Sequence, residues 1–120
     1  MKTILVIDDE PEFIESIRMR LEAAGYRVID ADDGDKGFRR AQRERPGLIL
    51  LDIMMPNVDG FQALYQLKKD NRVKSIPVII ITARSETDYI LDTGKFGAID
   101  YIVKPVDMNE LIKLVAKHIV

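Results

Sequence analysis

The stretch LILLDIMMPNVDG, residues 48–60, runs through four aliphatic residues, Leu48 to Leu51, and then places a carboxylate, Asp52, where a fifth apolar residue would be expected. Similar short apolar runs occupy residues 4–7, 78–81 and 101–103, and longer segments with helical spacing separate them. Runs this continuous are typical of strands covered on both faces, because the crossover helices of a parallel sheet pack against both sides. The sequence therefore predicts an α/β protein built on a parallel sheet.

The segments between these runs predict five helices. The first begins near Pro11 and ends at Gly25, and the others are expected at about 34–44, from 60, at about 86–96 and from 107. The first helix has an inward stripe of Ile14, Ile17, Leu21 and Ala24, and the third turns Phe61, Leu64 and Leu67 inward. Asp107 and Glu110 predict a capping arrangement for the last helix.

Two features depart from this regular pattern. Residues 26–31 read as a fifth strand, and its more polar composition places it at an edge of the sheet. Gly37 interrupts the second helix and predicts that this helix is weak, since glycine costs about 1 kcal/mol relative to alanine in a helix interior.

Composition narrows the class of protein. The 120 residues are 47% hydrophobic and fit one domain, 1–120. The formal net charge of -2 gives no electrostatic reason to expect nucleic-acid or membrane binding, and the chain has no cysteine for disulfides or thiol chemistry. The start, MKTILVIDDE, is too short in apolar residues for a signal peptide, and no run is long enough to span a membrane. A soluble, cytoplasmic protein is expected.

Each central strand is followed by, or ends in, a polar side chain. Because the carboxyl ends of parallel strands lie along one edge of the sheet, where ligands bind in such folds, these side chains are expected to converge. They are Asp8, Asp9, Asp52, Thr82 and Lys104. Each alone has an ordinary explanation as a cap, turn or surface residue, and only the combination predicts a site.

The chemistry of this set predicts phosphoryl transfer. Three carboxylates within a few ångström repel one another unless a cation lies among them, and an all-oxygen set without His or Cys suits Mg²⁺. Lys104 and Thr82 are suited to neutralising and hydrogen-bonding phosphoryl oxygens. Asp52 is then the nucleophile.

The chain resembles the response regulator receiver domains of two-component signalling over all 120 residues. The motifs that carry the resemblance are VIDDEP, LILLDIMMPNVDG, VIIITA and GAIDYIVKP, in this order. The resemblance implies a doubly wound (βα)5 flavodoxin-like fold with strand order 2-1-3-4-5. It also implies Mg²⁺ ligation by Asp8, Asp9, Asp52 and the Met54 backbone carbonyl, a Thr82–Tyr101 switch pair, a phosphate contact from Lys104, and a cis peptide before Pro105.

The resemblance implies a signalling switch and not a metabolic enzyme. Asp52 would accept the phosphoryl group from a histidine kinase or a histidine phosphotransfer protein. The surface of the fourth helix, fifth strand and fifth helix would then control a downstream protein effector or a covalently linked output domain. The cognate kinase, the pathway, the phosphate lifetime and the oligomeric state stay open.

Two other functions fit the sequence less well. A Mg²⁺-dependent phosphohydrolase of the haloacid dehalogenase kind also forms an aspartyl phosphate, but it requires an acid two residues after the nucleophile, where this chain has Met54. A scaffold that has lost the chemistry is disfavoured by the intact residue set. His118 is expected to be structural, and Arg39, Arg40, Lys68 and Lys69 are expected on solvated helix faces without a DNA-reading element.

Overall fold

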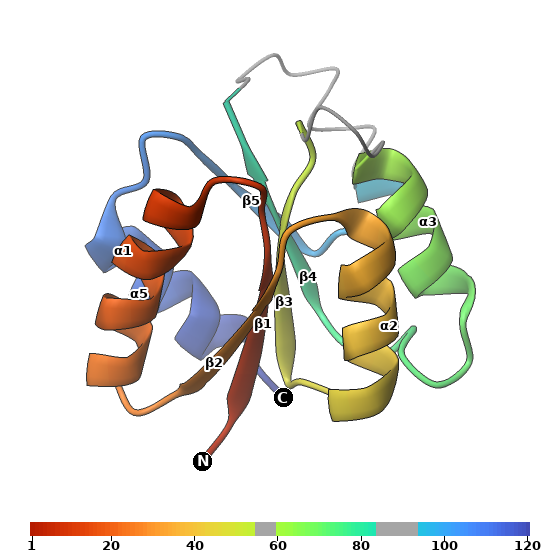
Figure 1. The fold of residues 1–120 in the computed structure, drawn as a ribbon, viewed down its shortest axis with the longest axis horizontal. Coiled ribbons are helices and arrows are strands. Elements are labelled where there is room, and N and C mark those ends of the chain that lie inside the picture. Colours follow the sequence, from red (N-terminus) through yellow and green to blue (C-terminus); the bar gives the residue numbers. More distant parts are fainter. Residues whose placement is uncertain (55–59, 84–93) are drawn as a thin grey trace.

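The structure is a computed structural model that describes residues 1–54, 60–83 and 94–120. Its centre is a five-stranded parallel sheet with the order β2-β1-β3-β4-β5, as the resemblance implied (Figure 1). The strands are β1 Thr3–Ile7, β2 Arg27–Ala31, β3 Leu48–Asp52, β4 Val78–Thr82 and β5 Asp100–Val103. The more polar segment forms β2 at one edge, which confirms its predicted place.

Helices cover both faces of the sheet (Figure 1). Helices α1 (Pro11–Ala23) and α5 (Met108–His118) lie on one face, and α2 (Gly34–Glu44) and α3 (Gly60–Lys69) lie on the other. Every residue of β3 and β4 is buried between these layers, which explains their unbroken apolar sequences. Most of the fourth predicted helix, 86–96, falls outside the described residues. No described helix has the length and hydropathy required to cross a bilayer.

The helix ends follow the predicted chemistry, with one exception. Asp107 caps α5 by accepting hydrogen bonds from the backbone N–H groups of Asn109 and Glu110. Ile14, Ile17 and Leu21 are buried on α1 as predicted. Ala24 is exposed, so its inclusion in the inward stripe was wrong: it is the C-cap of α1, where the helical spacing no longer applies.

Gly37 has a packing role that its helix propensity does not reveal. A Cβ atom at this position would lie 2.4 Å from Cδ1 and 2.7 Å from Cγ1 of Ile7, which is fully buried at the end of β1. The missing side chain lets α2 approach the sheet directly beside the residue that precedes Asp8. Glycine therefore allows close contact between the helix and the sheet here, although it lowers the helix propensity of this segment.

Two arginines cover the outer edge of β2. Arg18 of α1 donates to the Val28 carbonyl at 2.8 Å and pairs with the Asp30 carboxylate, and Arg40 of α2 donates to the Asp30 carbonyl at 2.6 Å. The expectation that Arg40 is simply solvated was wrong, because this carbonyl draws its side chain onto the edge strand. Lys68 was also misplaced: its ammonium is half-buried and donates to the Lys74 and Ile76 carbonyls.

Candidate functional site

The register of the sheet brings the predicted site residues to one rim. Ile7 pairs with Leu51, so Asp8 is level with Asp52 on the neighbouring strand. Thr82 pairs with Val103, so Lys104 lies one residue beyond Thr82. Because all strands are parallel, these positions share the carboxyl edge of the sheet, the upper rim in Figure 1.

Four carboxylates gather at this rim. One oxygen from each of Asp8, Asp9, Glu10 and Asp52 lies within 4.8 Å of the others. Asp8 is fully buried and Asp52 is 4% exposed, whereas Asp9 and Glu10 face solvent. The cluster is therefore open on one side and closed on the other, and its donor set of carboxylate oxygens fits a hard divalent cation such as Mg²⁺.

Backbone hydrogen bonds orient the two buried carboxylates. The Glu10 N–H donates to Asp8 Oδ1 at 2.9 Å, and the Met54 N–H donates to Asp52 Oδ1 at 2.9 Å. In both residues this leaves Oδ2 directed at Lys104. The turn after each strand thus supplies the donor that holds the acid at the end of that strand.

Lys104 contacts three of the four carboxylates of the cluster. Its Nζ lies 3.1 Å from Asp8 Oδ2, 3.3 Å from Asp52 Oδ2 and 2.6 Å from Glu10 Oε1, and its side chain is 16% exposed. The ammonium also sits 4.2 Å from the centre of the Phe13 ring. The peptide bond between Lys104 and Pro105 is cis, as the resemblance implied.

The surroundings of the site disfavour the charged form of Asp8 and favour the charged form of Lys104. Burial raises the pKa of Asp8 from 3.8 to about 6, and the neighbouring charge of Asp52 adds to the rise, against the Glu10 N–H and Lys104. Burial alone would lower the pKa of Lys104. The hydrogen bonds to Glu10 and Asp8 and the charges of Asp52 and Asp8 outweigh burial, so the pKa of Lys104 is raised. The Lys104 ammonium therefore stays charged, whereas burial disfavours the ionised form of Asp8.

Thr82 and Tyr101 share one face of the sheet. Tyr101 pairs with Ile80 and Val103 pairs with Thr82, so the side chains at these four positions point to the side covered by α2 and α3. Thr82 is fully buried, whereas Tyr101 is 41% exposed. Arg84 and residues 55–59, which follow β4 and β3 closely in sequence, lie outside the described residues.

Sequence reasoning did not anticipate two contacts of Lys104. Glu10 is the N-cap residue of α1 but makes no side-chain cap hydrogen bond; it pairs with Lys104 instead. Phe13 lies one helical turn further on and supports the same ammonium. These contacts could be predicted from the positions of Glu10 and Phe13 only if the end of β5 were already known to lie beside the start of α1. His118 bonds Asp100 at the amino end of β5, at 3.0 Å, away from the cluster.

Comparison with known proteins agrees with this geometry. The sequence model of the response regulator receiver domain matches residues 4–116. Protein PilH of Pseudomonas aeruginosa is 41% identical over 116 residues, covering 96% of this chain and 95% of PilH. The phosphate regulon regulator PhoB of the same organism is 39% identical over 92% of this chain but only 48% of its own length, so the chain spans about half of such transcriptional regulators.

Solved structures show the same fold. The Vibrio cholerae chemotaxis protein CheY4 superposes with a TM-score of 0.93 at 26% identity, covering 99% of each chain. The receiver domain of the sensor histidine kinase PA1611 of Pseudomonas aeruginosa, whose active-site cleft coordinates a magnesium ion, superposes with a TM-score of 0.89 at 29% identity, over 98% of this chain and 96% of that one. The residues at the strand ends, the strand order and these matches agree: this chain belongs to the family of response regulator receiver domains.

Proposed function

We propose that this receiver domain takes a phosphoryl group onto Asp52 from the phosphohistidine of a histidine kinase or a histidine phosphotransfer protein. The observation that carries the proposal is the approach of Lys104 Nζ to Asp52 Oδ2, 3.3 Å, inside a cluster of four carboxylates. A buried acid that faces a lysine and is ringed by metal-type ligands is suited to receive a dianionic group.

The metal would be held by Asp8, Asp9, Asp52 and the Met54 backbone carbonyl. The composition of the cluster supports this assignment, because four carboxylates lie within 4.8 Å of one another and Lys104 offsets a single negative charge. When bound, Mg²⁺ neutralises phosphoryl oxygens and relieves the repulsion among the carboxylates.

The protein's own residues account for the transfer step. The Met54 N–H holds Asp52 Oδ1, so Oδ2, which lies beside Lys104, is the oxygen positioned to attack phosphorus. A bond forms between Oδ2 and phosphorus as the bond from phosphorus to the histidine nitrogen breaks, and the electron pair leaves with that nitrogen. Lys104 lies where the arriving phosphoryl oxygens need a cation, and the Thr82 hydroxyl donates a hydrogen bond to one of them.

Phosphorylation would become a signal through Thr82 and Tyr101. A phosphoryl group adds about -1.5 to -2 charge and three acceptor oxygens, which draw Thr82 toward Asp52. The half-exposed Tyr101 ring then turns inward on the shared face of the sheet. A cavity of about 310 Å³ between β5 and α5, lined by Tyr101, Pro105 and Leu114 among others, belongs to the surface that changes. A protein effector or a linked output domain would respond to this surface.

Labelling by a small phosphodonor tests the first step. Wild-type protein incubated with acetyl phosphate and Mg²⁺ should form a hydroxylamine-labile phosphoprotein, and EDTA should prevent its formation. Asp52→Asn should abolish the label, and the matched change Asp35→Asn, at an exposed residue of α2, should keep it. Continued labelling of Asp52→Asn would overturn the nucleophile. If the protein instead released phosphate from a small phosphoester over many turnovers, the phosphohydrolase function would be favoured.

The switch needs a separate measurement. Fluorotyrosine-labelled protein should show a change at Tyr101 by ¹⁹F NMR when beryllofluoride and Mg²⁺ are added. Tyr65 is the internal control, because it is 50% exposed on α3 and belongs to no part of the proposed path. An unchanged Tyr101 signal, with Asp52 shown to be occupied, would refute the switch role.

A further inference from the structure

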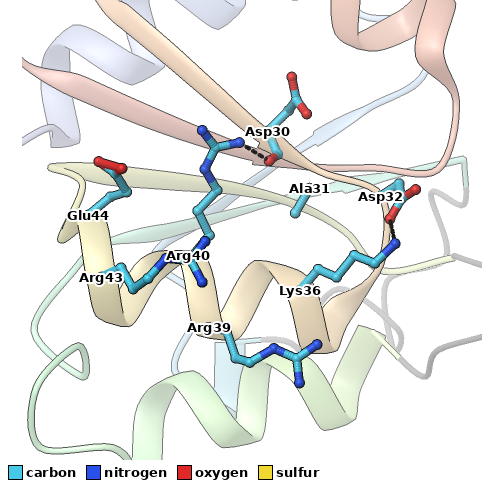
Figure 2. Close-up of a pocket in the computed structure, with 8 residues that line it drawn as sticks. All are labelled: Asp30, Ala31, Asp32, Lys36, Arg39, Arg40, Arg43 and Glu44. Carbon is cyan, nitrogen blue, oxygen red and sulfur yellow. Dashed lines mark hydrogen bonds and ion pairs between the residues drawn. The ribbon is translucent and has the colours of Figure 1, made fainter.

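A basic groove lies along the edge of the sheet, between β2 and α2 (Figure 2). Its volume is about 550 Å³. Four cations of α2 line it, and they follow one another at intervals of three, one and three residues, which places them in a single stripe of the helix. These residues are Lys36, Arg39, Arg40 and Arg43.

Two of the four cations are engaged within the protein. Arg40 reaches across to the Asp30 carbonyl at 2.6 Å, and Lys36 pairs with Asp32 at 3.0 Å (Figure 2). Arg39 and Arg43 have no carboxylate within 4.0 Å among the described residues, and both are exposed. Arg39 and Arg43 are therefore the guanidinium groups open to a partner, and Arg40, whose acceptor is a neutral carbonyl, adds a positive charge to the same groove.

The acids of the groove do not cancel this charge. Asp30 pairs with Arg18 of α1, and Glu44 pairs with Arg27 of β2 at 3.3 Å. Asp32 is held by Lys36. Each acid thus has its own cation, and none of them offsets Arg39, Arg40 or Arg43. The two arginines open to a partner, Arg39 and Arg43, lie one helical turn apart, with Cβ atoms separated by roughly 5–6 Å.

We infer that this groove binds a partner protein through an acidic stripe on a helix. Two carboxylates one turn apart on such a helix match the spacing of Arg39 and Arg43, and each can accept a bidentate hydrogen bond from a guanidinium group. The edge strand itself is closed to an added strand, because Arg18 and Arg40 occupy its outward carbonyls. The partner is therefore recognised by side-chain charge and not by backbone pairing.

The charge distribution favours a protein over a nucleic acid. Nucleic-acid binding needs many phosphate contacts, whereas the groove offers three cations without a carboxylate partner among the described residues, and one of these, Arg40, already donates to a backbone carbonyl. Asp35 and Glu44 flank these cations in sequence, and the whole chain carries a net charge of -2. None of the described residues that line the groove is aromatic, so they offer bases no surface on which to stack. The inference does not depend on phosphorylation of Asp52, because the groove does not include that residue.

Two peptides of identical composition test the inference. Both are helical, contain alanine and glutamine as filler, and carry six glutamates; one arranges the glutamates in a single stripe, and the other distributes them around the helix. Each peptide is titrated into the ¹⁵N-labelled, unphosphorylated protein and followed by NMR. The chemical-shift changes should be concentrated in α2, and the striped peptide should bind at least fivefold more tightly than the peptide with distributed glutamates. Circular dichroism checks that both peptides have equal helicity.

Charge-reversal variants locate the binding. Arg39→Glu with Arg43→Glu should remove the preference for the striped peptide, and the neutral pair Arg39→Gln with Arg43→Gln should weaken it. The matched control reverses two other exposed cations, Lys2→Glu with Lys74→Glu, and should keep it. Equal binding of both peptides, no binding, or tighter binding of a twelve-residue oligothymidine would each overturn the inference.

Discussion

Replacing Asp8 by asparagine should stabilise the metal-free protein, and the gain should depend on pH. The pKa of Asp8 is about 6 in the folded protein and 3.8 without burial, so between these values the folded state binds more protons than the unfolded state. The free energy of unfolding therefore falls as the pH rises through this window. Asparagine cannot ionise and escapes this loss.

The size of the gain follows from the same two pKa values. At about 1.4 kcal/mol for each unit of pKa, ionised Asp8 costs the folded protein about 3 kcal/mol at pH 8. At pH 4.5 the cost is about 1 kcal/mol, because Asp8 is then mostly protonated in the folded protein. For a chain of this length the gain at pH 8 corresponds to a rise in Tm on the order of 10 °C.

Urea unfolding in EDTA, followed by circular dichroism at pH 8 and pH 4.5, measures both values. Asp35→Asn is the matched control: Asp35 is exposed in the first turn of α2, and removal of its charge should cost at most about 1 kcal/mol, the opposite sign to the gain expected for Asp8→Asn. Mg²⁺ should stabilise the wild type and not Asp8→Asn. A gain of equal size at the two pH values, or a loss of stability at pH 8, would contradict the assignment of a strained, buried carboxyl.

Three further outcomes are expected. Gly37→Ala should destabilise by about 1–3 kcal/mol in spite of its better helix propensity, and Ile7→Val, which removes the Cδ1 atom nearest the added Cβ, should recover part of that loss in a double-mutant cycle measured by urea unfolding. Asp107→Ala should cost about 1 kcal/mol through loss of the α5 cap, and an unchanged urea midpoint would exclude this role. The hydrogen bond from the Arg72 side chain lowers the pKa of Asp70, so Asp70→Asn should lower Tm at pH 7. The difference in Tm from the wild type should shrink as the pH falls below about 4, because Asp70 then becomes protonated in the unfolded protein. A difference that does not change with pH would show that the charge of Asp70 is not the cause.

The strand ends were predictable from sequence because the chemistry repeats at the same structural position. An apolar run that stops at a polar residue marks the carboxyl edge of a parallel strand, and the sheet register then places Asp8, Asp52, Thr82 and Lys104 together. No detailed knowledge of side-chain packing was needed, since the backbone alone brings these positions to one rim.

Contacts across elements were not predictable in the same way. From sequence Gly37 is only a weak point of a helix, and its contact with Ile7 becomes visible in the structure. The pairing of Glu10 with Lys104 likewise has no local signal in the sequence. Arg40 looks solvated in a helical pattern, although it bonds a carbonyl of the edge strand. In each case the partner is distant in sequence, and local periodicity contains no information about it.

The arginines on β2 also bear on self-association. A bare outer strand is a template on which a second molecule can extend the sheet, and repeated extension leads to cross-β aggregates. With the Val28 and Asp30 carbonyls already accepting from Arg18 and Arg40, that template is interrupted at two successive outward-facing positions. Side chains from two different helices thereby protect this border of the sheet against the addition of a further strand.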